Sequence, residues 1–104
     1  MSRAIMVLVT EPPQPRPMTE SGDFSTVFVE GKNIVVRTDT FKKGDLALFI
    51  PPDCDIPKNV MEEFNDYNFD TEGMLIPLTH PIFSKILGFR YVGEDLTDAL
   101  NIKI

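Results

Sequence analysis

The sequence is poor in the residues from which many catalytic and metal sites are built. It contains one cysteine, Cys54, and one histidine, His80. A single cysteine excludes an internal disulfide and a paired-cysteine zinc site, and a single histidine excludes a histidine pair on one helix. No glycine-rich phosphate loop of the Walker type is present. We therefore expect a protein of the reducing cytoplasm that holds no metal and no cofactor.

Cysteine chemistry is further disfavoured by the neighbours of Cys54. The thiol lies between Asp53 and Asp55, and two nearby carboxylates raise the pKa of a thiol and suppress the reactive thiolate. A metal held by these two carboxylates and His80 is conceivable, but an Asp-Cys-Asp run after two prolines is typical of turn residues that cap the backbone. We expect a protein that is not an enzyme.

Long apolar runs are also missing. No run approaches the ~20 residues that a membrane-spanning helix needs. The N-terminus lacks the long apolar region and cleavage site of a signal peptide, and we interpret it as a first strand. A chain of 104 residues, 42% apolar, is large enough for one core and too small for two. We expect a single domain over residues 1–104.

Negative charge is concentrated in one stretch. The net charge is −6, and residues 53–72 hold seven acidic side chains against the single basic Lys58. The segments on either side are balanced, with six basic and six acidic residues in 1–52 and three of each in 73–104. Tight binding to an extended phosphate backbone requires several Lys or Arg on one face, so the acidic stretch disfavours it. The stretch is either a solvated loop that maintains solubility or a surface for a basic protein partner.

The remaining sequence is organised around a short apolar strand. Leu46 to Ile50 is an unbroken apolar run that follows a Gly-Asp turn and is stopped by Pro51-Pro52. We predict a strand that is buried on both faces. The proline-rich stretch from Glu11 to Pro17 should form a stiff, extended loop that cannot join a central strand.

Apolar patterning and turn residues predict the other elements. Further strands are expected at 5–9, 24–30, 34–38 and 73–78, with a tight hairpin connection at Gly31–Asn33. Short helices are expected at 58–65, at 81–87 with Gly88 as its C-cap, and at 93–100. The prediction is a mainly β fold, a small barrel of five or six strands with two or three short helices.

Cationic and aromatic side chains form a second candidate set. An arginine can fork onto a phosphate, and a tyrosine can stack on a base. One member of the set lies on the strand predicted at 34–38 and the others follow Pro77, so only a closed barrel would bring them together. The alternative is a barrel rim of ordinary snorkelling side chains. The predicted ligand contacts are Arg37, His80, Lys85, Arg90 and Tyr91.

Three stretches occur in a familiar order. Lys43-Gly44-Asp45 precedes the apolar strand, which is followed by Pro-Asp and Ile-Pro pairs within 52–57. Residues 72–78 read Glu-Gly-Met-Leu-Ile-Pro-Leu, and residues 92–102 contain Gly-Glu-Asp-Leu-Thr-Asp and Leu-Asn-Ile. Together they resemble the N-terminal OB-fold-like domain of an RNA ligase family found in bacteria and phages, over roughly residues 24–104.

The resemblance implies an OB-like barrel, and two departures from the family bear on function. In the ligases this domain precedes a nucleotidyltransferase domain with a Lys-x-Asp-Gly nucleophile motif, and the present sequence contains no such motif. The basic strand that the family places before its Gly-Leu-apolar-Pro strand is replaced by the acidic segment 65–70. We therefore expect the OB-like fold without the ligation chemistry and with weaker binding to RNA.

These observations lead to three functional hypotheses. The first is a non-catalytic module that binds a small nucleotide-type ligand or the end of a short RNA, such as a phage protein that sequesters a nucleotide signal. The second is an acidic inhibitor or adaptor that binds a basic protein. The third is an accessory subunit that supplies an RNA ligase with this domain in trans. The candidate contacts for the second hypothesis are Glu62, Glu63 and Asp66.

Overall fold

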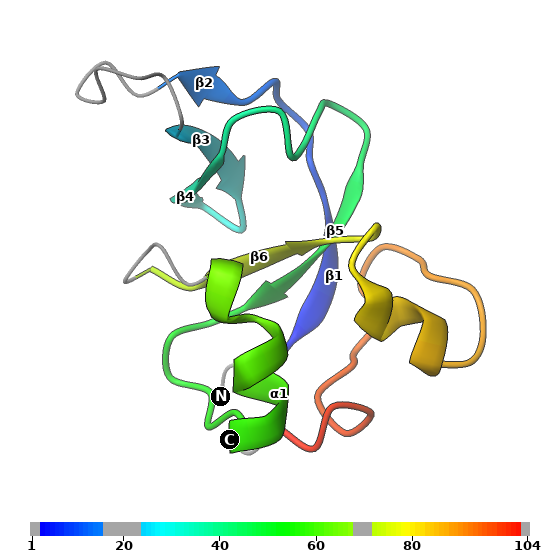
Figure 1. The fold of residues 1–104 in the computed structure, drawn as a ribbon. Helices are drawn as coiled ribbons and strands as arrows, with labels where there is room; N and C mark the ends of the chain where they lie inside the picture. The colour runs from blue at the N-terminus through cyan, green and yellow to red at the C-terminus, as the bar shows by residue number, and fades with distance from the viewer. Residues whose placement is uncertain (1–2, 16–23, 68–71, 103–104) are drawn as a thin grey trace.

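The computed structural model describes residues 3–15, 24–67 and 72–102. Within these ranges the chain is mainly β, and its helices are short (Figure 1). The strands are β1 (Ile5–Leu8), β2 (Gln14–Pro15), β3 (Phe24–Val29), β4 (Lys32–Arg37), β5 (Leu46–Ile50) and β6 (Met74–Pro77), and the helices are α1 (Lys58–Glu63) and the 3-10 helices η1 (Asn65–Tyr67) and η2 (Pro81–Lys85). None of the helices in the described ranges is both long and apolar enough to cross a bilayer. The predicted fold class is confirmed.

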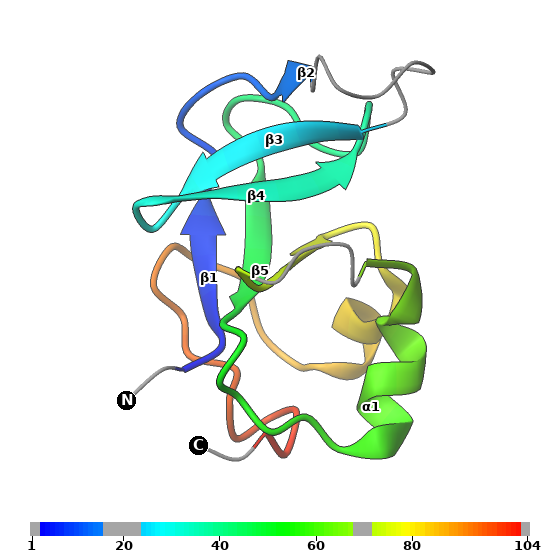
Figure 2. The ribbon, with the colours of Figure 1, turned by 90° about the vertical axis from the view of Figure 1, so that its left-hand side faces the viewer.

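The strands form two antiparallel sheets of three strands each. β5 lies between β1 and β6 in one sheet, and β3 lies between β2 and β4 in the other. In Figure 2, β3 and β4 run across β1 and β5 rather than along them, and β4 contacts β6. The described strands therefore pair as two crossed sheets and not as one continuous barrel.

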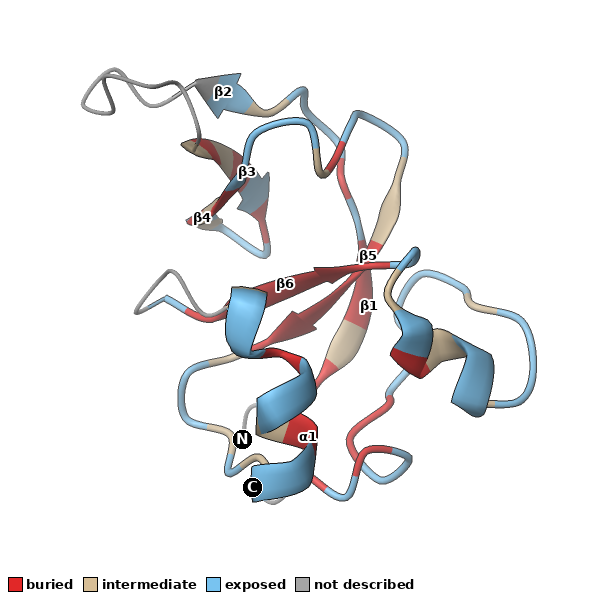
Figure 3. Ribbon diagram, viewed as in Figure 1, coloured by how far each residue is buried: buried red, intermediate tan, exposed pale blue. Residues whose placement is uncertain are grey.

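Strand β5 is buried on both faces, as its apolar run predicts. Leu48 and Ile50 pack into a core formed with α1, η2 and the C-terminal segment. Ala47 and Phe49 face the other way and pack into a second core against the β3–β4 hairpin. Figure 3 shows the sheet of β1, β5 and β6 as the buried centre of the molecule. One strand thus holds the two cores together.

The hairpin turn differs from its predicted position, and part of the predicted proline-rich loop forms a short edge strand. The β3–β4 hairpin turns at Glu30–Gly31, with φ of +50° and +76°, and not at Gly31–Asn33. Two positive φ values in a two-residue loop match the right-handed twist of the flanking strands. Within the proline-rich stretch, Gln14–Pro15 pairs with β3 as an edge strand, a position where proline is tolerated.

Two predicted helices are shorter or absent. The helix expected at 81–87 ends at Lys85, and the next residue is already extended, so Gly88 is not its cap. The helix expected at 93–100 is wrong. Its backbone pairs with the first strand instead, since Leu96 N–H donates to Ala4 O at 2.9 Å and Asp95 bridges Ile5. Only one helical turn remains, closed by Leu100 N–H and Leu96 O at 3.0 Å.

Side chains reinforce this attachment of the C-terminal segment to β1. The hydroxyl of Thr97 accepts from Ala4 N–H at 2.9 Å, and Thr97 N–H donates to Asp95 Oδ1 at 2.9 Å. Asp95 also pairs with Arg3. Hydrogen bonds from Thr97, together with Arg3, hold the pKa of Asp95 below its ordinary value. The Asp-Leu-Thr sequence that looked like a helix start therefore covers the edge of a sheet.

Candidate ligand pocket

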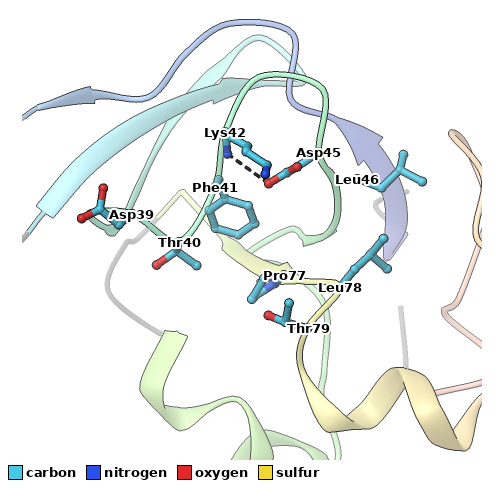
Figure 4. Close-up of a pocket in the computed structure, with 9 residues that line it drawn as sticks. All are labelled: Asp39, Thr40, Phe41, Lys42, Asp45, Leu46, Pro77, Leu78 and Thr79. Atoms are coloured by element: carbon cyan, nitrogen blue, oxygen red, sulfur yellow. Dashed lines mark hydrogen bonds between the residues drawn. The ribbon is translucent and has the colours of Figure 1, made fainter.

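A pocket of about 500 Å³ opens between the β4–β5 connection and the segment that follows β6. Figure 4 shows side chains of the two segments facing one another across it, with the ring of Phe41 above Pro77. The volume is in the usual range for sites that take small molecules. The described lining residues are Asp39, Thr40, Phe41, Lys42, Asp45, Leu46, Pro77, Leu78 and Thr79.

The upper wall of the pocket is a turn whose shape is fixed by hydrogen bonds. Lys42 N–H donates to Asp45 Oδ2 at 3.0 Å, and Asp45 N–H donates to Lys42 O at 3.1 Å. The same turn is attached to the first strand, because Val9 N–H donates to Asp45 O and Gly44 N–H donates to Val9 O, both at 2.8 Å. Gly44 has a φ of +95°, which glycine adopts without strain. The Lys-Gly-Asp sequence therefore builds a rigid wall.

The lining is suited to binding a molecule that has both apolar and polar parts. Phe41 and Pro77 are buried and form an apolar floor, and Leu78 extends it with a half-exposed side chain. Thr40 and Thr79 add hydroxyl groups, Lys42 adds a positive charge, and Asp39 and Asp45 add two carboxylates. A few polar groups around an apolar floor are the usual composition of a ligand pocket.

The pocket unites two parts of the chain that sequence analysis treated as a candidate pair. Its walls follow β4 on one side and begin at Pro77 on the other, so the fold does bring these segments together. None of the five predicted ligand contacts is among the described lining residues. Arg37 ends β4 and is exposed, and the other four lie between His80 and Tyr91.

His80 uses both ring nitrogens within the fold. Its Nδ1 accepts from Ile82 N–H at 3.0 Å and so caps η2, while Nε2 lies 2.9 Å from Glu63 O. With Nδ1 accepting, Nε2 is the ring nitrogen that donates to Glu63 O. The ring also packs edge-on against Phe64 and Tyr67, at centroid distances of 5.2 and 5.5 Å. His80 therefore connects η2 to the end of α1.

The two cations of this segment are paired with carboxylates. Lys85 Nζ lies 2.9 Å from Glu63 Oε1, and Arg90 Nε lies 3.2 Å from Glu94 Oε1. Arg90 also donates from Nη2 to Leu87 O at 2.7 Å, and its side chain is only 9% exposed. Its third nitrogen, Nη1, is buried and has no hydrogen-bond partner among the residues that the structure describes. In contrast, Tyr91 is 62% exposed. Binding of a ligand by these residues stays a prediction.

The acidic residues lie on and beside α1. Glu62 and Glu63 are neighbours at its C-terminal end, and Asp66 lies in η1. All three are exposed, and Glu63 forms the ion pair with Lys85. A protein contact through these residues is likewise still a prediction.

Cys54 and its two neighbouring aspartates lie in the turn that follows β5. Cys54 is half-buried, and the pKa of its thiol is raised as predicted, but the larger cause is desolvation, with a smaller contribution from Asp53. In the part of the chain that the structure describes, no three His, Cys, Asp or Glu residues are close enough to hold a metal ion.

Sequence reasoning missed the residues that line the pocket. No ligand contact was predicted in residues 38–45, although they combine Thr-Asp-Thr with Lys-Lys-Gly-Asp. Asp39 has a φ of +68°, a conformation that is uncommon for residues other than glycine and often marks functional loops. The polar residues before the Gly-Asp turn were the available signal.

Comparison with known proteins gives a match in structure alone. No protein-family model and no curated protein matches the chain. Solved structures of the Naegleria gruberi RNA ligase do match: a variant with ATP and Mn has a TM-score of 0.77 over 99% of this chain at 18% identity. A second variant with AMP and Mn has a TM-score of 0.74 over 96% of the chain, and the ligase with pyrophosphate has 0.74 over 99%, both at 18% identity.

The chain has the fold of an RNA ligase domain. It spans about a third of the ligase, 34–35% of that chain. At 18% identity the structural match shows the fold alone, and it confirms the resemblance predicted from three short motifs.

Proposed function

We propose that the chain is a non-catalytic binding module of the RNA ligase type, which takes a nucleotide or the end of a short RNA into the pocket lined by Phe41 and Pro77. The observation that carries this proposal is the fold: nearly the whole chain superposes on part of a ligase whose structures contain ATP, AMP or pyrophosphate. A signalling nucleotide, as in the first functional hypothesis, belongs to the same class of ligand as ATP and AMP.

The pocket has groups that suit such a ligand. A planar base can pack on the apolar floor of Phe41, Pro77 and Leu78, and the threonine hydroxyls can bond to its edge or to a ribose. Lys42 supplies one positive charge for a phosphate. The single lysine shares the lining with two carboxylates, Asp39 and Asp45, so the pocket suits one or two phosphates better than a long RNA backbone, which needs a row of cations.

A lysine variant and its neighbour provide a matched test. Lys42 and Lys43 are both exposed on the same turn. Of the two, Lys42 is among the described residues that line the pocket and Lys43 is not. Lys42→Ala should weaken binding of ATP or a 5′-phosphorylated short RNA by about tenfold or more, because a charge-assisted contact is lost. Lys43→Ala should leave the Kd, measured by isothermal titration calorimetry, within about twofold. Equal effects of the two substitutions would place the ligand elsewhere.

The proposed absence of catalysis has its own test. Nucleotidyl transfer needs a nucleophile, and the 104 residues contain no Lys-x-Asp-Gly motif. Incubation with labelled ATP and Mg²⁺ should leave the chain unlabelled after denaturing electrophoresis. A stable covalent adduct would show that the chain is an enzyme.

A place beside a ligase follows from the same proposal. A module with the fold of about a third of a ligase would work next to the catalytic remainder, on the same polypeptide or on a separate one. The acidic set is not required by this role. Substituting Glu62 and Glu63 by Gln and Asp66 by Asn should therefore not change nucleotide affinity.

A further inference from the structure

A short loop after η2 exposes an unusual amount of apolar surface. Leu87 and Phe89 are each 94% exposed, and Tyr91 and Val92 are 62% and 58% exposed. Scattered exposed apolar residues are ordinary, but a contiguous patch of large ones marks an interaction site. We refer to residues 87–92 as the apolar loop. It follows η2 as the orange segment at the right of Figure 1.

The apolar loop is held in shape from within. Arg90 lies beneath it, bonded to Leu87 O and paired with Glu94. Its far end is attached to β1, because Gly93 N–H donates to Met6 O and Met6 N–H donates to Glu94 O, both at 2.8 Å. A loop that is fixed before binding loses little conformational entropy when a partner covers it.

The charges around the apolar loop favour a protein as its partner. Single-stranded RNA and anionic membranes are bound by aromatic groups together with available cations. The cations nearest in sequence are Lys85 and Arg90, and both are paired with carboxylates. The loop therefore presents a neutral, apolar surface, which suits an apolar hollow on another protein domain.

We propose that the apolar loop docks on the remainder of an RNA ligase, the part of such an enzyme that this fold does not cover. This inference rests on the proposed function. The fold covers 34–35% of the Naegleria gruberi ligase, so about two thirds of that polypeptide accompanies it there. Docking would cover Leu87 and Phe89, which nothing in the described parts of the chain covers.

A chimera tests the docking. The chain would replace the matching third of the Naegleria gruberi ligase, in wild-type form and with Leu87→Ser and Phe89→Ser combined. Docking predicts a single melting transition for the wild-type chimera and two for the loop variant. The amides of residues 87–92 should also exchange at least tenfold more slowly in the wild-type chimera than in the isolated chain.

An exposed aromatic far from the loop gives the control. Phe28 is 42% exposed on β3 in the other sheet, and a chimera with Phe28→Ser should melt as the wild type does. Two transitions in the wild-type chimera, or amide exchange that the chimera does not slow, would overturn the proposal. A dimer of the isolated chain in sedimentation that the loop substitutions dissociate would assign the loop to a second copy, and would overturn it as well.

The two proposals can fail separately. The isolated loop variant keeps its pocket, so its affinity for ATP should equal that of the wild type. If the wild-type chimera does not dock but the isolated chain binds ATP, the docking alone is refuted. If the isolated wild-type chain does not bind ATP, the pocket is refuted.

Discussion

His80 connects three elements through one side chain. Its ring caps η2, bonds to the last residue of α1 and packs against Tyr67 of η1. A histidine followed by proline before an apolar turn was interpreted as a possible ligand contact, because the sequence does not show what lies beside it. The structure gives it two internal partners. Lys85 and Arg90 likewise have internal carboxylate partners, Glu63 and Glu94.

The role of His80 can be separated from ligand binding by one substitution. His80→Ala removes the cap and leaves Glu63 O without its partner, which should lower the free energy of unfolding by about 1–3 kcal/mol. The affinity for ATP should not change. Urea denaturation and calorimetry on the same sample measure the two quantities. A higher Kd for ATP with an unchanged free energy of unfolding would show that the ring binds the ligand.

At the scale of elements, β5 was predicted with its exact bounds because its signals are local. An unbroken apolar run between a Gly-Asp turn and two prolines leaves little choice of structure. The segment after Gly93 was predicted wrongly because its signals are equally local but its partner is distant. Met6 on β1 and Ala4, just before β1, bond to its backbone groups, and that pairing replaces the helix.

The central position of β5 predicts a large effect of substitution. Leu48 is fully buried in the core that contains α1, and Leu48→Ala should lower the free energy of unfolding by about 2–5 kcal/mol. Leu8 on β1 is 40% exposed, and Leu8→Ala should cost less than about 1 kcal/mol. Denaturant titration of the two variants checks this order. Similar losses would show that the core is placed wrongly.

At the scale of the whole molecule, the position of the pocket could not be predicted, because its two walls meet only after the two sheets cross. Its walls come from the segments after β4 and after β6, and neither contains a recognised ligand motif. The fold itself was within reach, because three motifs in order resemble a ligase domain. The net charge of −6, concentrated in 53–72, agrees with a small ligand rather than an extended nucleic acid.

The location of the ligand is the central claim, and an NMR titration of the labelled chain with ATP tests it most directly. The proposed pocket predicts saturable amide shifts at Thr40, Phe41, Lys42, Leu78 and Thr79, with little change at residues 87–92. Shifts centred on Arg37 and the 80–91 segment, or no saturable shift at millimolar ATP, would contradict it.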